Sequence, residues 1–279
     1  MNKLFFVVIH LAALSALWTG ASAVAVIFCL MAYLVRMFAI TAGYHRLFSH
    51  RSYSTSRFFQ FVLAFIGASS AQKGPLWWAA SHRHHHKHSD TELDIHSPGI
   101  RGIWWAHVGW VISKEYDEVD LELVKDLTKY PELMLLEKYH YIPPLIFLLS
   151  VAGLGVLIEQ YLPSAQTSML QFFVWGTFVS TVLLYHATFA INSLTHVFGK
   201  RRFATSDQSR NSLILALITL GEGWHNNHHR YPGSERQGFY WWEIDLTHLV
   251  LLFLRKLGIV WNLRVPPQRI YDEALKQSA

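Results

Sequence analysis

Long apolar stretches separated by charged regions dominate the pattern of this chain. From Leu4 to Ile40 the only charged residue is Arg36, and Thr19-Gly20 interrupts that stretch. A second apolar region begins at Ile142, and no Asp, Glu, Lys or Arg lies between Glu159 and Lys200. Because about 20 apolar residues cross the hydrocarbon core of a bilayer, the pattern predicts four membrane-spanning helices in two hairpins. Their expected bounds are about 4–18, 21–42, 142–162 and 169–191.

The basic residues mark out the two remaining regions. Of the 24 Lys and Arg residues, all but Lys3 and Arg36 fall within residues 41–140 and 200–279. The outer turns of the two hairpins carry none, so the positive-inside rule places both termini and both basic regions in the cytoplasm. With 52% apolar and only 15% charged residues, the composition excludes an ordinary soluble enzyme. We expect one all-α membrane domain over 1–279, with a cytosolic helical cap at about 43–141 and 192–279.

Histidine is unusually frequent, at 17 residues, and it is clustered. Three boxes stand out: His45-Arg-Leu-Phe-Ser-His50, His82-Arg-His-His-His86 and His225-Asn-Asn-His-His229. The second and third boxes share the spacing i, i+3, i+4, which places three imidazoles on one face of a helix. His84 falls on the opposite face and is therefore left out of the candidate ligands.

A fourth polar group ends the last predicted span, in Asn192-Ser-Leu-Thr-His196. The i, i+4 spacing puts Asn192 and His196 on one helix face. Polar side chains at the end of a membrane span cost free energy, so their presence there indicates a functional role. Together with the three boxes, His196 gives nine candidate imidazoles, too many for one metal ion and suitable for two. All-nitrogen ligation with open positions suits iron that handles oxygen, whereas structural zinc normally stops at four ligands. A solvated histidine-rich tract is the alternative explanation for any single box.

These motifs, in this order, resemble the membrane fatty acyl-CoA desaturases of the stearoyl-CoA desaturase type, in a compact bacterial form. The resemblance extends from about residue 30 to 265 and also includes His107-Val-Gly-Trp110 and the Gly-Glu-Gly-Trp that precedes His225. It implies a four-span fold with a cytosolic cap in the bacterial inner membrane. The implied reaction is oxygen-dependent insertion of a cis double bond, expected at delta-9, into a saturated fatty acyl chain.

The resemblance also implies roles for individual residues. The two iron ions would be held by His45, His50, His82, His85, His86, His196, His225, His228 and His229, with Asn192 reaching one iron through water. The bend of the acyl tunnel would be formed by Gln72, Trp78, Thr188 and Phe189, and its closed end by Tyr33 and Met37. Because Met37 is bulkier than the small residue of the animal enzymes, we expect a preference for palmitoyl-length over stearoyl-length chains.

Acidic residues beside the boxes are candidates for orienting the imidazoles through their second nitrogens. These candidates are Asp90, Glu92, Asp94 and Glu222. The eight other histidines are expected to have structural roles: His10, His84, His88, His96, His107, His140, His186 and His248.

The chemistry requires partners outside the chain. Acid–base or nucleophilic catalysis cannot remove hydrogen from an unactivated methylene, so we expect two iron ions as cofactors and O2 as co-substrate. The sequence has no glycine fingerprint for a flavin or nicotinamide, no cysteine set for an iron–sulfur cluster and no fused cytochrome b5 motif. An external electron donor of the ferredoxin, rubredoxin or cytochrome b5 type is expected. The other expected partners are the acyl substrate and membrane lipid, with no nucleic acid.

The acyl carrier is where the sequence departs from the animal relatives. They have Arg-Asp directly before the second box to bind CoA, whereas this chain has Ala80-Ser81. Acyl-CoA is still favoured, and a phospholipid or acyl carrier protein remains open.

Two other functions fit parts of the pattern. A di-iron membrane hydroxylase or alkane monooxygenase would keep the metal site and insert oxygen in place of a double bond. A histidine-rich metal-binding or transport protein should have polar residues in the middle of its spans, and only Arg36 and His186 are of that kind.

Overall fold

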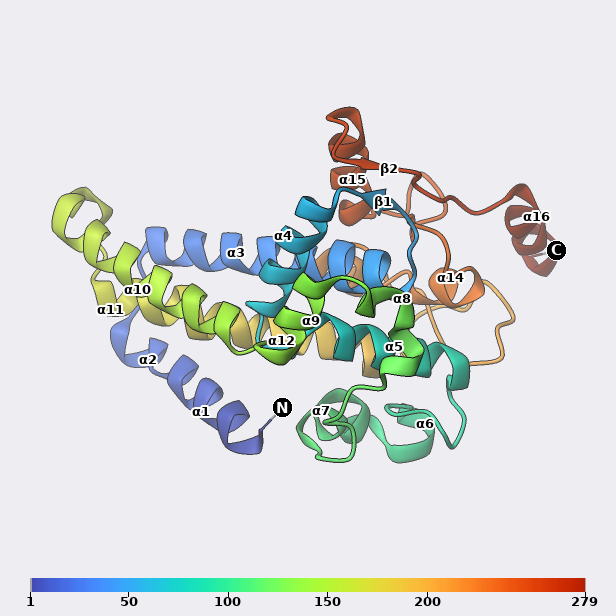
Figure 1. Ribbon diagram of the computed structural model, residues 1–279, viewed down its shortest axis with the longest axis horizontal. Coiled ribbons are helices and arrows are strands. Elements are labelled where there is room, and N and C mark those ends of the chain that lie inside the picture. The colour runs from blue at the N-terminus through green and yellow to red at the C-terminus, as the bar shows by residue number, and fades with distance from the viewer. Residues whose placement is uncertain (1, 279) are drawn as a thin grey trace.

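The computed structural model describes residues 2–278, with side chains described over residues 2–274. Helices form nearly all of its regular structure. The strands in this range are β1 (Ser54–Thr55) and β2 (Val260–Trp261), which pair antiparallel. The long apolar helices run alongside one another toward one end of the molecule, and the shorter cap elements gather at the other end (Figure 1). The expected all-α architecture is confirmed.

Three helices are long and apolar enough to cross a membrane: Ala23–Ser49, Ile142–Tyr161 and Met169–His196. They correspond to three of the four expected spans. Two of them reach further into the cap than the sequence predicted, because no proline interrupts either helix at the membrane boundary. The first comprises α3 (Ala23–Phe38) and η1 (Ala39–Ser49), the second is α10 (Ile142–Tyr161), and the third comprises α11 (Met169–Phe173), η5 (Val174–Val179), α12 (Ser180–Ser193) and η6 (Leu194–His196).

The remaining expected span, at about 4–18, is a shorter apolar helix, Lys3–Thr19. It consists of α1 (Lys3–Leu14) and α2 (Ala16–Thr19), which meet at Ser15. The Ser15 hydroxyl donates to the Ala12 carbonyl at 2.5 Å, and such bonding back to the preceding turn bends helices. The segment is therefore helical and apolar as expected, but it is shorter than the three candidate spans.

The cap consists of short helices, and one of its apolar clusters packs against the end of the first span. In this core, Tyr44 and Phe48 of η1 are fully buried together with Leu76, Leu133 and Leu251. Burying each such side chain stabilises the fold by about 1.5–3 kcal/mol, so the core fixes the end of the first span against the cap. The cap helices are α4 (Arg57–Ala68), α5 (Pro75–His88), α6 (Pro98–Arg101), η2 (Trp105–Gly109), α7 (Trp110–Ile112), η3 (Leu121–Val124), α8 (Lys125–Thr128), α9 (Pro131–Lys138), α13 (Leu213–Ile218), α14 (His225–Arg230), α15 (Leu246–Lys256) and α16 (Gln268–Ser278), while η4 (Pro163–Ala165) lies between α10 and α11.

The start of α5 is capped by a side chain from another element. The Glu137 carboxylate accepts the backbone N–H groups of Leu76 and Trp77, at 2.8 and 3.0 Å. A carboxylate at a helix N-terminus satisfies unpaired donors and interacts favourably with the helix dipole. A Cβ on Gly74 would overlap this carboxylate, so glycine is required there. This cap orients the helix that carries the second histidine box.

Candidate metal centre

The first histidine box lies on a π-helix, η1. The backbone N–H of His50 bonds to the carbonyl of His45 at 3.2 Å, which is the i→i+5 bond of such a helix. In an α-helix, residues five apart would point about 140° away from each other. The wider turn instead brings the His45 and His50 rings to 4.9 Å between centroids.

The second and third boxes lie on α5 and α14, as their spacing predicted. Each helix contributes to two separate groups of imidazoles, whose nitrogens lie within 4.8 Å of one another inside each group. One group is His45, His50, His82, His86 and His228, and the other is His85, His196, His225 and His229. The structure thus brings together all nine histidines selected from the sequence. His84 belongs to neither group, and one of its ring nitrogens lies 2.9 Å from the Leu93 carbonyl.

Carboxylates orient the rings from outside. His85 Nδ1 lies 2.9 Å from Asp94, His196 Nδ1 lies 3.0 Å from Asp90, and His229 Nδ1 lies 2.8 Å from Asp207. His45 Nδ1 pairs in the same way with Glu222. Ionised carboxylates only accept hydrogen bonds, so Nδ1 donates in each pair and Nε2 is left with its lone pair directed inward.

The pKa values of the acids support this assignment. Burial acts to raise the pKa of Asp90, but hydrogen bonds from His196, Ser97 and the Gln208 backbone outweigh it and lower the pKa to about 2. Burial also acts to raise the pKa values of Asp94 and Asp207. Interactions with His85 and His229, respectively, outweigh it and hold both pKa values well below their ordinary range. These carboxylates are therefore ionised at neutral pH.

The inward nitrogens fit bound cations. Nε2 of His225 lies 3.1 Å from Nε2 of His196 and 3.0 Å from Nε2 of His229. The other two rings both present lone pairs, and His225 can offer at most one proton, so hydrogen bonding cannot satisfy all three nitrogens. Nε2 of His85 is buried without any hydrogen-bond partner. A cation within the group would satisfy these nitrogens together.

The rings are also in the protonation state that metal binding needs. Burial, and then repulsion from neighbouring imidazoles, holds five pKa values well below the ordinary 6.5, those of His50, His82, His86, His225 and His228. Burial also lowers the pKa of His229 to about 4, although Asp207 acts in the opposite direction. The ionised Asp90, Asp94 and Asp207 carry negative charge that bound cations would offset. The site therefore fits two metal ions.

Glu222 is held in place by a buried charge network. Arg46 donates to Glu222 Oε1 and to Asp245 Oδ1, both at 3.0 Å, and these side chains are almost fully buried. Buried charges require such pairing. Gly221 has φ +124°, and a Cβ there would overlap the Asp245 carboxylate. The glycine before Glu222 is thus needed for both its backbone conformation and its close approach.

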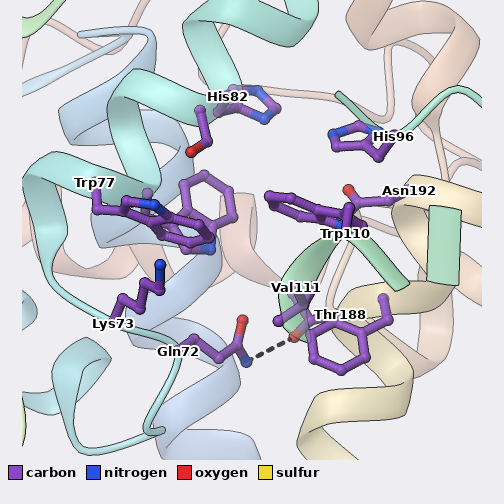
Figure 2. Close-up of a pocket in the computed structure, with 12 residues that line it drawn as sticks. Gln72, Lys73, Trp77, His82, His96, Trp110, Val111, Thr188 and Asn192 are labelled. Atoms are coloured by element: carbon purple, nitrogen blue, oxygen red, sulfur yellow. Dashed lines mark hydrogen bonds between the residues drawn. The ribbon is translucent and has the colours of Figure 1, made fainter. Parts of the chain in front are cut away.

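A cavity opens beside the first group of histidines (Figure 2). His82 lies at one end, and Gln72 and Thr188 are joined by a 3.2 Å hydrogen bond at the other. Trp78 stacks on the His82 ring, at 5.2 Å between centroids and an interplanar angle of 21°. All four residues expected at the bend of the tunnel line this cavity: Gln72, Trp78, Thr188 and Phe189.

The remaining sequence-predicted residues belong to neither histidine group. Asn192 lines the cavity and is in neither histidine group. Met37 is fully buried against Leu184 and Ala187 of α12, with Tyr33 packed beside them. The Tyr33 hydroxyl donates to the Ile218 carbonyl at 2.6 Å. Both residues therefore lie between the first and third spans rather than on the cavity wall.

The structure also adds residues that sequence reasoning missed. Asp207 orients His229 although it lies in a loop well before the third box, and no spacing rule points to it. The expected acid Glu92 is exposed and belongs to none of the candidate metal-binding clusters among the described residues. His96, assigned a structural role, lines the cavity and lies near His85 and Asp94.

Comparison with known proteins agrees with this geometry. Residues 5–263 match the family model described as fatty acid desaturase. An sn-1 stearoyl-lipid 9-desaturase of Anabaena variabilis is 38% identical over 96% of this chain and 95% of that protein. An sn-2 palmitoyl-lipid 9-desaturase of Nostoc sp. (strain 36) is 34% identical over 96% and 91%. An icosanoyl-CoA 5-desaturase of Limnanthes douglasii is 34% identical over 100% and 76%.

Proposed function

Because the chain belongs to the fatty acid desaturase family, we propose that it inserts a cis double bond at the delta-9 position of a saturated fatty acyl chain, using O2 and two iron ions. The observation that carries the proposal is the position of His82. It belongs to the first histidine group and also lines the cavity, so a methylene in the cavity lies next to the metal site.

The chain's own residues bind and orient the substrate. The nine histidines would hold the two iron ions, and bound iron would supply the activation of O2 that hydrogen removal from an unactivated methylene requires. Trp78 and Phe189 provide apolar contacts for the acyl chain and exclude water from the cavity. The Gln72–Thr188 hydrogen bond lies at the far end of the cavity, and we propose that an acyl chain bends to pass it. Restraining the chain in a bent conformation favours the cis product.

The carrier we propose is a membrane lipid. Two of the relatives carry lipid 9-desaturase names, and Ala80-Ser81 offers no charged side chain for CoA before the second box. Acyl-CoA, favoured by the family resemblance, is the second candidate, because the Limnanthes relative is named for an acyl-CoA substrate. The 9-desaturase names also support the proposed double-bond position.

We propose that a separate protein supplies the electrons. The chain has one cysteine, Cys29, which is too few for an iron–sulfur cluster. We propose a ferredoxin, rubredoxin or cytochrome b5 type of donor. We also propose a bacterial inner-membrane location with the termini and the site in the cytoplasm, supported by the three apolar helices and the basic residues of the cap.

Purified protein loaded with iron and given O2 and a ferredoxin system tests the proposal. Deuterated palmitoyl chains are supplied on vesicle lipid in one reaction and on CoA in another, and the products are identified by mass spectrometry. We expect a deuterated 9-cis-monounsaturated chain on the lipid. A hydroxylated chain would instead identify a hydroxylase. Conversion of the CoA-bound chain alone would reverse the proposed carrier.

A further inference from the structure

Three histidines outside the metal centre form a chain of hydrogen bonds across three elements. His10 lies on α1, His186 on α12 and His107 on η2. Nε2 of His10 lies 3.0 Å from Nε2 of His186, and Nδ1 of His186 lies 3.0 Å from Nε2 of His107. None of the three belongs to either histidine group of the metal centre. Polar side chains on apolar helices cost free energy and indicate a function, so this triad needs its own explanation.

The outer ends of the triad fix where its protons lie. Nδ1 of His10 lies 2.7 Å from the Phe6 carbonyl, which only accepts hydrogen bonds, so this nitrogen carries the proton. The Ser193 hydroxyl donates to the Phe189 carbonyl, and its oxygen lies 2.9 Å from Nδ1 of His107. Nδ1 of His107 is therefore the donor to Ser193. The Nε2 atoms of both outer rings present lone pairs to the central ring.

The central ring has one proton fewer than its contacts can use. A neutral imidazole has one N–H group, so His186 donates to only one of its two neighbours. An added proton lets it donate to both, and a proton can then leave through the ring opposite the one by which it entered. The partners of the three rings are one another, the Phe6 carbonyl and the Ser193 hydroxyl, with no acid among them that would hold the charge.

Apolar surroundings keep the triad neutral between transfers. The Phe6 ring lies 4.1 Å from the His10 ring between centroids, and the Phe189 ring lies 6.0 Å from His107 and 6.3 Å from His186. Burial lowers the pKa of His107 below its ordinary value. A lasting charge is unfavourable in such surroundings, so a proton that reaches the triad is passed on and not stored.

A polar pocket lies at the start of α1, on the side of His10. This pocket is lined by Lys3 of α1 and by cap residues that include Trp105, Ser113 and Lys114. Lys3 and His10 are seven residues apart, so they share one face of the helix and lie about 10 Å apart along it. The pocket therefore brings solvent within two helical turns of His10, whose side chain is only partly buried.

The other end of the triad lies behind the wall of the catalytic cavity. Ser193, the partner of His107, directly follows Asn192, which lines the cavity. Phe189, whose carbonyl accepts from Ser193, lines the same cavity. Asn192 lies toward the end of the cavity that holds His82 (Figure 2). One hydroxyl group thus separates His107 from the residues that surround the substrate.

We propose that His10, His186 and His107 form a relay that carries protons from the cap surface to the catalytic cavity. The inference rests on the proposed desaturase function, which consumes protons. In that reaction O2 takes two hydrogen atoms from the acyl chain, two electrons from the donor and two protons from solvent, and leaves as two water molecules. The acyl chain is oxidised and O2 is reduced. An acyl chain in the cavity excludes water, so these protons need a path through the protein.

His186→Gln tests the relay against a merely structural role. A carboxamide still forms hydrogen bonds with its neighbours, but it cannot take up one proton and release another. His140→Gln is the matched control, because His140 is a partly buried histidine outside the triad. O2 consumption and the reaction product are measured in H2O and in D2O on iron-loaded protein.

We expect His186→Gln to consume O2 about tenfold more slowly and its ratio of rates in H2O and D2O to rise about twofold, because proton delivery becomes rate-limiting. Imidazole added to His186→Ala should restore part of the rate. The KM for the acyl substrate should not change, and His140→Gln should match the wild type. A slower His186→Gln with an unchanged isotope ratio, together with no response of His186→Ala to imidazole, would show a structural role only and overturn the relay.

A measurement without turnover separates the relay from the proposed function. Nitrogen NMR of histidine-labelled ferrous protein reads which ring nitrogen carries each proton and detects couplings across N–H···N bonds. We expect His10 and His107 to carry their protons on Nδ1 and His186 to couple to one of them. Absence of any such coupling would overturn the chain. If the coupling and the isotope effect are present while the wild type forms a hydroxylated product and no double bond, the relay stands and the proposed function fails.

Discussion

His229 Nδ1 lies 2.8 Å from a carboxylate oxygen of Asp207, although the two residues are 22 positions apart in the chain. The contact sets which ring nitrogen carries the proton and which faces the metal centre. It also makes His229 the one ligand of the third box with a carboxylate partner, since Nδ1 of both His225 and His228 is buried without one.

Asp207→Asn should therefore weaken iron binding by about 10–100-fold. Without the carboxylate, the His229 ring is no longer held in one orientation and its Nε2 becomes less basic. Iron per chain after titration with a chelator measures the effect. Glu92→Gln is the matched control, since Glu92 is an exposed acid beside the second box. Equal iron retention in the two variants would contradict the orienting role.

His85→Ala and His228→Ala should each abolish activity while the protein still inserts into the membrane. Each removes one ring from a different histidine group. His84→Ala is the control from the same box and should keep its iron and substantial activity, because His84 belongs to neither group. Metal analysis and turnover are measured on all three proteins. Complete loss of iron from His84→Ala would show that the selection of ligands on α5 is wrong.

Gly221→Ala should destabilise the fold by about 1–3 kcal/mol, since a Cβ at φ +124° is strained and overlaps Asp245. Gly153→Ala is the comparison, because a Cβ at that helical position meets no atom within 4 Å. Thermal unfolding in detergent should show a lower midpoint for the first variant only. An unchanged midpoint would mean that the Arg46 network can rearrange around a side chain.

Met37→Ala should shift the substrate preference from palmitoyl-length toward stearoyl-length chains. Met37 lies outside the described cavity, and we expect a long acyl chain to extend past the cavity toward it. There, forcing extra methylenes into the filled space between α3 and α12 costs about 1–3 kcal/mol. Competition between the two chain lengths measures the shift. Met31→Ala, at an exposed position of the same helix, should leave the ratio unchanged. The same ratio in all three proteins would exclude Met37 as the end of the tunnel.

Helical periodicity explains why so much of the candidate site could be predicted. On α5 and α14, residues spaced i, i+3, i+4 lie on one face of the helix. His82, His85 and His86 could therefore be selected as ligands and His84 rejected. Asp207 has no such regularity. Its contact with His229 joins residues 22 positions apart, so it follows from tertiary structure and not from local spacing.

The first box shows a different limit. His45 and His50 are five residues apart, a spacing that α-helical geometry would direct to different sides, and only the π-helical turn of η1 brings their rings together. The predicted ends of two spans also fell short of the helices in the structure. Hydropathy predicted where the apolar residues stop, whereas the helices continue to Ser49 and His196, because in the cap tertiary packing stabilises helices that are no longer apolar.

The sharing of α5 and α14 between the two histidine groups couples the two positions mechanically. A rotation of α5 that displaces His85 from one group displaces His82 and His86 from the other, and α14 imposes the same constraint from the opposite side. Binding of a first ion would therefore fix both helices and lower the ordering cost for the second. We therefore expect the two ions to bind with positive cooperativity.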